Sequence, residues 1–153
     1  MRVETKWFGT IEIGEDKIIT FEKGLIGFED SRRFTIVYNS ENENETSIMW
    51  LQSVDDVSLA LPIMKPEIVI DNYDPVVEDE LIYALGDNIE TAELLVVVAL
   101  TVPSELKKMT CNLKAPIIIN IDTLKGVQVI ADNEDYQVRY PIYDVLESEK
   151  DGE

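Results

Sequence analysis

The sequence predicts an all-β fold, a small antiparallel β-barrel-like or sandwich domain with one short helix. About ten short runs rich in Val, Ile, Thr, Tyr and Phe recur along the chain, and clusters of Gly, Pro, Asn and Asp separate most of them. Only one segment has the apolar spacing of a helix. Strands joined by tight turns favour an antiparallel architecture over alternating α/β units.

The length is that of a single domain. We expect residues 1–146 to form this β domain and residues 147–153 to be a charged, frayed tail. No run of about 18 apolar residues is present, and no basic start precedes an apolar segment, so the sequence indicates a cytoplasmic protein without a membrane span. The single cysteine, Cys111, cannot form an internal disulfide, which agrees with a reducing compartment.

Two apolar runs predict the centre of the fold. Residues 94–102 contain one hydroxyl and no charge, which is typical of a strand covered on both faces. Pro103 ends this strand, and a single helical turn is expected through residues 105–109. Residues 117–121 then form a second run rich in β-branched side chains, so two adjacent buried strands are expected.

The N-terminal third predicts a strand, a hairpin and a shaped loop. Residues 2–8 alternate weakly between polar and less polar side chains, as in a strand with one wet face. Residues 10–13 and 17–21 are β-rich runs around a short Gly-Glu-Asp segment, which predicts a hairpin. Two glycines three residues apart indicate a loop at 22–30, which Leu25 and Phe28 are expected to hold against the core.

The middle of the chain predicts four further strands. Three of them are expected at residues 34–38, 48–54 and 67–70. The fourth, at 58–64, contains Pro62, which indicates an edge position or a bulge. Residues 39–47 are polar and acidic and predict a turn that buries nothing.

The remaining elements are the helix and two late strands. Residues 77–85 carry apolar side chains on one side and precede Gly86, which can end a helix. We expect this short helix to lie across the sheet. Strands are expected at 127–131 and 136–140, joined by an acidic turn.

The residue types present exclude most catalytic and cofactor sites. Histidine is absent, so histidine bases, histidine triads and histidine metal sites are excluded. Cys111 lacks the histidine that usually activates a nucleophilic thiol, and we interpret it as structural. The sequence has no EF-hand loop, no P-loop and no dinucleotide fingerprint, and its carboxylates show no context of a buried acid–base pair. We therefore expect no cofactor and no metal.

The charge points to a protein partner. The 31 acidic and 13 basic residues give a formal net charge of −18, which repels nucleic acid and anionic membrane surfaces. The same field attracts a basic protein and accelerates its association. The alternative is that the negative charge only keeps the protein soluble.

One stretch concentrates this charge. Residues 66–106 contain no Lys or Arg but ten carboxylates, and Ile68, Ile70, Tyr73 and Val76 offer apolar side chains beside them. The candidate partner-binding residues are Glu67, Asp71, Tyr73, Asp74, Glu78, Asp79 and Glu80. The alternative is that the apolar side chains of this stretch all point inward and the acids are simply its solvated side.

Three sequence segments together resemble the FliW family of flagellar assembly factors. They are TKWFGTIEIGEDKIITFEKGLIGFED, VALTVPSELKKMTCNLKAPIIIN and GVQVIADNEDYQVRYPI, in the order in which the family has them. Together they span nearly the whole chain, and their combination is specific. Cys111 stands where a small residue is expected, and the region of the predicted helix is the least distinctive part.

This resemblance implies a non-enzymatic regulator with a β-barrel-like fold. FliW proteins are bound by the RNA-binding translational repressor CsrA and by flagellin in a mutually exclusive way. Abundant flagellin occupies FliW and frees CsrA to repress flagellin messenger RNA, whereas exported flagellin leaves FliW free to capture CsrA. The motif residues Phe28, Glu29, Asn112, Leu113, Ala115 and Pro116 are interpreted as structural, because an Asn side chain in such a turn bonds nearby backbone groups.

Two other classes of protein remain open from the residues alone. A small β-barrel enzyme using carboxylates or Lys would contain a deep polar pocket. A structural subunit would present a large self-complementary apolar face. A FliW-like regulator would instead bind a small basic RNA-binding protein and flagellin, each displacing the other.

Overall fold

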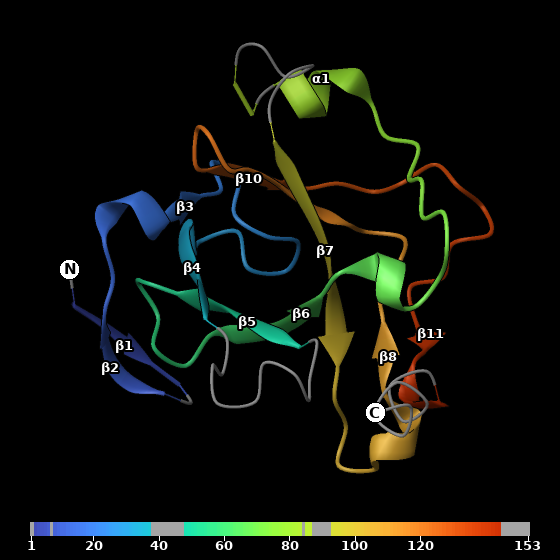
Figure 1. Ribbon diagram of the computed structural model, residues 1–153, viewed down its shortest axis with the longest axis horizontal. Helices are drawn as coiled ribbons and strands as arrows, with labels where there is room; N and C mark the ends of the chain where they lie inside the picture. Colours follow the sequence, from blue (N-terminus) through green and yellow to red (C-terminus); the bar gives the residue numbers. More distant parts are fainter. Residues whose placement is uncertain (1, 7, 38–47, 84, 87–92, 145–153) are drawn as a thin grey trace.

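The computed structural model confirms the all-β fold, and the short α-helix predicted in the middle of the chain is present as α1 (Figure 1). It describes residues 2–6, 8–37, 48–83, 85–86 and 93–144. The turn predicted at 39–47 and the tail predicted at 147–153 lie outside these residues. The strands are β1 (Arg2–Thr5), β2 (Gly9–Glu12), β3 (Ile19–Thr20), β4 (Arg33–Val37), β5 (Met49–Ser53), β6 (Ala60–Met64), β7 (Leu94–Thr101), β8 (Thr110–Cys111), β9 (Ile117–Asn120), β10 (Lys125–Gln128) and β11 (Tyr140–Pro141). The helices are α1 (Asp79–Tyr83) and the 3-10 turns η1 (Glu15–Lys17), η3 (Pro66–Ile68) and η4 (Leu106–Lys108).

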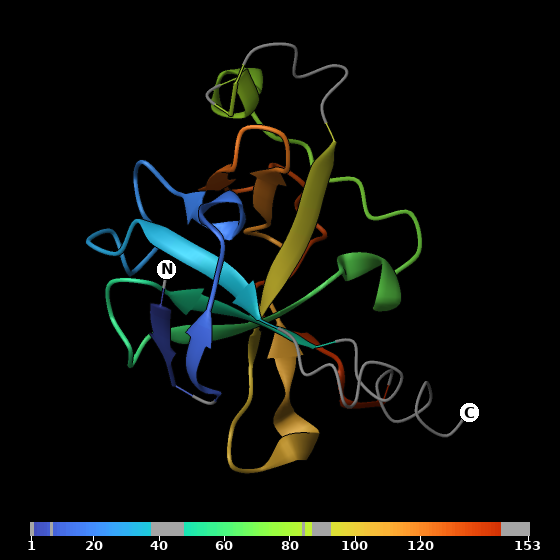
Figure 2. The ribbon, with the colours of Figure 1, turned by 60° about the vertical axis from the view of Figure 1, so that its left-hand side comes forward.

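Seven of the strands close into a barrel (Figures 1 and 2). The order β7-β6-β5-β4-β3-β10-β9 returns to β7, because β7 pairs with both β6 and β9. All these pairs are antiparallel except β3 with β10, which run parallel and meet at Thr20 and Lys125. Beyond the barrel, the end of β7 pairs with β8, and β8 pairs with β11.

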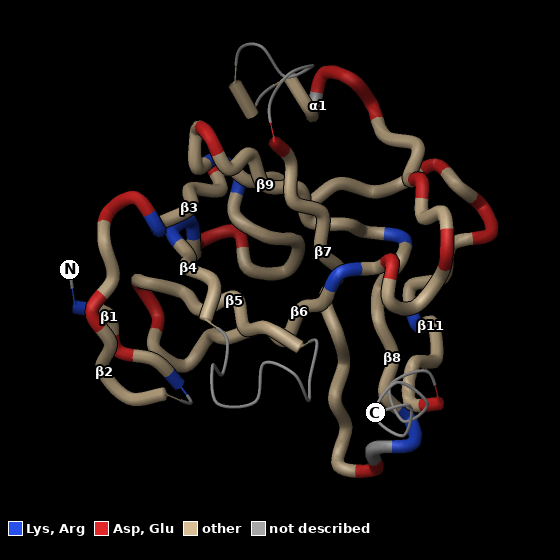
Figure 3. Tube along the Cα trace, in the orientation of Figure 1, with Lys and Arg blue, Asp and Glu red and all other residues tan. Residues whose placement is uncertain are grey.

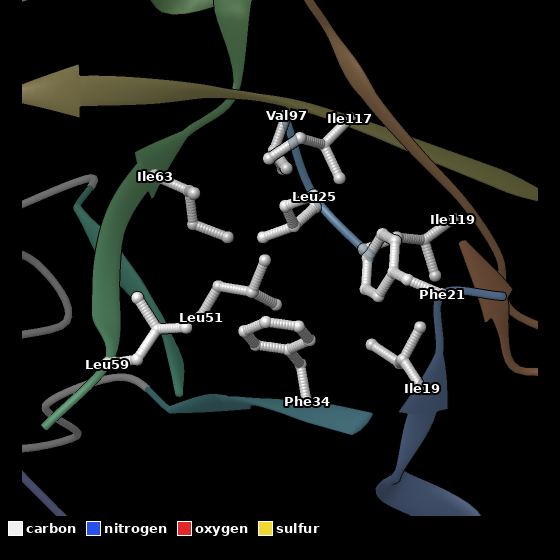
Figure 4. Close-up of a cluster of buried hydrophobic side chains, with 10 residues drawn as sticks. All are labelled: Ile19, Phe21, Leu25, Phe34, Leu51, Leu59, Ile63, Val97, Ile117 and Ile119. Carbon is white, nitrogen blue, oxygen red and sulfur yellow. The ribbon is translucent and has the colours of Figure 1, made fainter. Parts of the chain in front are cut away.

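The barrel interior is filled by aliphatic and aromatic side chains (Figure 4). Phe21 and Phe34 are fully buried and meet edge to face, with ring centroids 5.4 Å apart. The other buried members of this cluster are Ile19, Leu25, Leu51, Leu59, Ile63, Val97, Ile117 and Ile119. Burying these side chains supplies most of the free energy that holds so short a set of strands together.

The two apolar runs predicted to be central are neighbours in the barrel. β7 and β9 pair antiparallel, with Val97 opposite Ile117 and Leu95 opposite Ile119. All of β9 is buried, as its continuous β-branched sequence predicts. The helical turn expected after Pro103 is η4.

The prediction that residues 10–13 and 17–21 form a hairpin is wrong, because these two runs do not pair with each other. β2 pairs with β1 instead, and β3 pairs with β4 and β10. The Thr5 hydroxyl closes the β1–β2 connection, because it accepts a hydrogen bond from the Phe8 N–H (2.8 Å) and donates one to the Gly9 carbonyl (2.7 Å). Gly9 has a positive φ of 67° there. Residues 15–17 form the 3-10 turn η1, which leads the chain away from β2 to the barrel.

Two other predicted strands are also wrong. The segment expected as a strand at 67–70 begins as η3, because Pro66 has no N–H to give to a ladder and suits the first position of a helical turn. The strand expected at 136–140 is reduced to Tyr140 and Pro141 in β11. Tyr136 instead packs against the segment that follows η3.

Two expectations are refined rather than overturned. The helix predicted at 77–85 is shorter, Asp79–Tyr83, and Gly86 follows it with a positive φ of 133°. Pro62 lies opposite Trp50 inside the barrel strand β6, not in an edge strand. The pairing of β6 with β7 starts only at Ile63, so Pro62 removes no donor from that ladder.

Candidate partner-binding site

The candidate site begins where the chain leaves β6. Pro66 starts η3, whose last residue Ile68 packs on the cluster formed by Met64, Leu100 and their neighbours. Asn72 then takes a left-handed conformation with a φ of 59°. This turn places residues 73–76 beside a loop that lies about sixty residues later in the chain, residues 132–136.

Hydrogen bonds join these two segments. The Val76 N–H donates to the Asn133 side-chain oxygen (2.6 Å), and the Asp132 N–H donates to the Val76 carbonyl (2.7 Å). The Asn133 amide donates to the Asp74 carbonyl (3.1 Å). The Asp74 N–H donates to the Tyr136 hydroxyl (2.7 Å). Because each bond uses backbone on at least one side, the segments hold each other in a fixed register.

Two stacked tyrosines anchor this junction to the turn that contains Leu113. The rings of Tyr73 and Tyr136 are 4.9 Å apart and inclined by 21°. The Tyr73 hydroxyl donates a hydrogen bond of 2.6 Å to the Leu113 carbonyl. Burial, followed by the nearby Tyr136, Cys111 and Glu67, raises the pKa of Tyr73 above its ordinary value. The stacked ring and the hydrogen bond to Leu113 give Tyr73 a structural role at this junction.

The joined segments carry a continuous set of exposed carboxylates, which we call the acidic face. They lie along the right-hand side of the molecule in Figure 3, from α1 to the 132–136 loop. Lys114 lies beside them, but its ammonium group donates to the Asn133 carbonyl (2.6 Å) rather than to a carboxylate. The acidic face consists of Glu67, Asp71, Asp74, Glu78, Asp79, Glu80, Asp132, Glu134 and Asp135.

The structure places the other predicted features of this stretch differently. Ile68 and Ile70 are partly buried against the core, so of the apolar side chains proposed as anchors Val76 is the most open, at 54% exposed. Glu105 lies away from the acidic face on the turn before η4 and pairs with Lys108 at 3.2 Å. Asp87 and Glu90 lie outside the described residues. The acids at 132–135 were not among the candidates, because the sequence shows them only as a turn distant from the stretch they join.

The comparison with known families decides which family this is. A family model described as "FliW protein" matches residues 2–142. The chain belongs to the FliW family.

The relatives and a solved structure agree with this assignment. The chain is 62% identical to the flagellar assembly factor FliW of Lachnospira eligens, over 98% of this chain and 99% of that protein. It is 53% identical to the flagellar assembly factor FliW of Lachnoclostridium phytofermentans, over 100% and 99% of the two chains. A crystal structure of the flagellar assembly factor FliW superposes with a TM-score of 0.81 at 30% identity, covering 93% of this chain and 96% of that chain.

The FliW motif residues 112–116 lie in the turn that enters β9. The Asn112 side-chain oxygen accepts hydrogen bonds from the N–H groups of Lys114 and Ala115, both at 3.1 Å. Leu113, Ala115 and Pro116 are buried. These contacts give the motif a structural role and join it, through the Leu113 carbonyl, to the tyrosine junction.

The other FliW motif loop, residues 22–30, is held differently from the prediction. Leu25 is buried at 1% exposure, but Phe28 is 42% exposed and does not pin the loop to the core. Backbone bonds between Leu25 and Phe28 close the turn, and the Glu29 carboxylate accepts the Gly27 N–H at 3.3 Å. A Cβ on Gly24 would lie 2.6 Å from the backbone of Glu29, so the motif glycine is required by close approach.

The described residues of this FliW chain offer little for other kinds of site. Among them, no group of three or more His, Cys, Asp or Glu side chains is arranged to hold a metal ion. In the same residues, no helix has the length and apolar character needed to cross a membrane. Cys111 is buried, and burial raises the pKa of its thiol to about 12.

Cys111 is expected to react with a thiol reagent such as DTNB only after unfolding. At pH 8, raising the pKa from 9.0 to about 12 lowers the thiolate fraction on the order of a thousandfold, and burial also blocks access. The release of thionitrobenzoate, followed by absorbance with and without urea, measures this difference. Because Cys111 is the single cysteine, the signal has one source, and similar rates in both conditions would contradict the burial.

Proposed function

We propose that this FliW-family protein regulates flagellin synthesis by exchanging two protein partners, CsrA and flagellin. In this proposal, flagellin that accumulates before export occupies the protein and leaves CsrA free to repress flagellin messenger RNA. When flagellin is exported, the protein captures CsrA and translation resumes. The protein acts by occupancy, and binding to flagellin also serves a chaperone-like role.

The acidic face is the observation that supports CsrA as a partner. An RNA-binding protein needs a positive surface, because its affinity for RNA depends on neutralising phosphates. Nine exposed carboxylates on two mutually bonded segments offer such a surface a fixed, complementary field. A docked protein with a formal net charge of −18 also repels RNA that approaches the same partner.

The proposal predicts that this protein releases leader RNA from CsrA. A preformed complex of CsrA with labelled flagellin leader RNA is titrated with the protein, and fluorescence anisotropy reports bound RNA. We expect release at low salt, and a weaker effect of the protein on CsrA as added salt screens the surface charges. Adding flagellin is expected to restore the CsrA–RNA complex.

Each arm of this titration has a clear contrary outcome. Failure to release RNA at both of two salt concentrations rules out CsrA antagonism. If the protein releases RNA from CsrA but added flagellin does not reverse this release, partner exchange is ruled out. CsrA antagonism then still stands. The salt dependence of direct binding between the protein and CsrA, measured without RNA, separates docking electrostatics from the salt dependence of CsrA–RNA binding itself.

A further inference from the structure

The barrel is open on the side where β3 begins. In its pairing with β4, β3 lies opposite only Arg33 and Phe34, so the register leaves Thr35 to Val37 of β4 without a partner from β3. A cleft of about 720 Å³ opens there and reaches the core residues Ile19 and Ile119. Its walls are largely apolar, with Ile36 from β4, Met49 from β5, Leu95 from β7, and Ile121 and Leu124 from the turn between β9 and β10. We call it the barrel cleft.

The segment that joins two walls of the barrel cleft is mostly polar. Residues 38–48 connect β4 to β5; the stretch 39–47, NSENENETS, contains no apolar residue, and Ile48 packs on the cluster of Met64 and Leu100 instead. Burying those polar and charged side chains against Ile36 and Met49 would cost free energy without returning an apolar contact. Among the residues that the structure describes, none fills the cleft, so we take its aliphatic occupant from another molecule.

The rim of the barrel cleft indicates the chemistry of that occupant. Lys17 and Lys65 line the cleft and are exposed, and no ion pair is formed by either ammonium group within the described residues. Glu12 and Asp16 line it as well, so the rim carries both signs of charge, in contrast to the acidic face. A fatty acid could pair its carboxylate with one lysine, but proteins usually enclose most of a small apolar ligand, and this cleft is open. An open aliphatic cleft whose lysines form no ion pair with the other described residues fits a protein segment that combines aliphatic side chains with a flanking carboxylate.

We propose that the barrel cleft binds an aliphatic, acid-flanked segment of flagellin, while the acidic face binds the basic partner. This inference rests on the proposed function, from which it takes the two partners. A filament subunit buries apolar surface against its neighbours, and the same surface is uncovered before assembly. Covering it requires an apolar site, which the barrel cleft supplies and the acidic face does not.

The two surfaces adjoin one another along the chain. Lys65 lines the barrel cleft, and Glu67 on the next turn belongs to the acidic face. Because Lys65 and Glu67 are only two residues apart, a protein docked on one surface would overlap sterically with a protein docked on the other. Partner exchange then needs no residue shared by both footprints.

The test compares matched substitutions at and away from the barrel cleft. Ile121→Glu places a charge on a 42% exposed cleft side chain, and Ile130→Glu does the same on a 55% exposed side chain outside it. Lys17→Glu, in η1 at the cleft, is matched by Lys107→Glu, in η4 away from it. Circular dichroism and thermal unfolding check that each full-length variant is folded, and calorimetric titration with purified flagellin and CsrA gives the dissociation constants.

The cleft variants are expected to bind flagellin at least about tenfold more weakly, and CsrA within about twofold of the unmodified protein. The matched variants Ile130→Glu and Lys107→Glu are expected to keep flagellin binding within about twofold. Unchanged flagellin binding by both cleft variants overturns the inference and leaves the proposed function standing. Loss of CsrA binding instead of flagellin binding also overturns it. If the unmodified protein binds neither partner, the proposed function fails and the inference fails with it.

Discussion

The triple variant Asp71→Lys, Asp74→Lys and Glu134→Lys is expected to bind CsrA about a hundredfold more weakly than the unmodified protein. The three side chains are exposed and belong to both segments of the acidic face. An exposed charge contact contributes up to about 1 kcal/mol, and three reversals remove about 3 kcal/mol, which corresponds to roughly a hundredfold in affinity. Calorimetric titration at low salt measures the change in affinity for CsrA. Added salt is expected to reduce the difference in affinity between the variant and the unmodified protein.

A matched variant separates the position of the charges from their number. Glu4→Lys, Asp30→Lys and Asp122→Lys reverse three exposed carboxylates on other elements. Each set of three reversals changes the formal net charge from −18 to −12, since every reversal adds two units. If both triple variants lose CsrA affinity equally, the overall field rather than the acidic face attracts the partner. If neither loses affinity, the electrostatic account of docking is wrong.

The folding stability of the protein is expected to fall by about 3–5 kcal/mol in Phe21→Ala, a large part of the total for a domain of this size. Phe21 is fully buried, meets the ring of Phe34 edge to face and lies directly on Gly126. Truncation removes its apolar contacts and leaves a cavity between β3, β4 and β10 at the weakest part of the barrel closure, where β3 has two residues. Urea unfolding followed by tryptophan fluorescence measures the loss.

Phe28→Ala is the matched control for this prediction. Phe28 lies seven residues later and is 42% exposed, so its removal is expected to cost about 1 kcal/mol or less. A second control is Gly126→Ala, because an added Cβ would lie 2.5 Å from the Phe21 ring. Gly126→Ala is expected to destabilise the protein less when Phe21→Ala is also present, since the smaller side chain removes the clash. Equal losses in Phe21→Ala and Phe28→Ala would contradict the role given to the barrel core.

Most of the secondary structure followed from local sequence patterns. The continuous apolar runs predicted β7 and β9 because a strand buried on both faces has no polar positions. Periodicity predicts which side of a strand is buried but carries no information about its neighbour. For this reason the prediction of which strand pairs with β2 was wrong. Both runs of the expected hairpin do contain strand residues, but they pair with other strands. Residues 67–70 and 136–140 had β-rich compositions, but Pro66 and the tyrosine junction imposed other conformations.

The sequence predicted only part of the candidate site, because a local pattern does not show which distant segment lies beside it. The absence of Lys and Arg from residues 66–106 marked one half of the acidic face. Asp132, Glu134 and Asp135 form the other half, and a charge count along the chain cannot show that Asn133 bonds to Asp74 and Val76. The barrel cleft left no local signal at all, because its walls come from segments far apart in the chain.

The sequence by itself determined that this is an acidic, histidine-free β domain of the FliW family, because composition, short apolar runs and motif spacing are properties of the chain alone. Only the tertiary structure decided which strands close the barrel, which acids share a face and where the core is open. Those features depend on contacts between residues tens of positions apart, and such contacts form only when burying the whole set of apolar side chains outweighs the entropy of closing the loops between them.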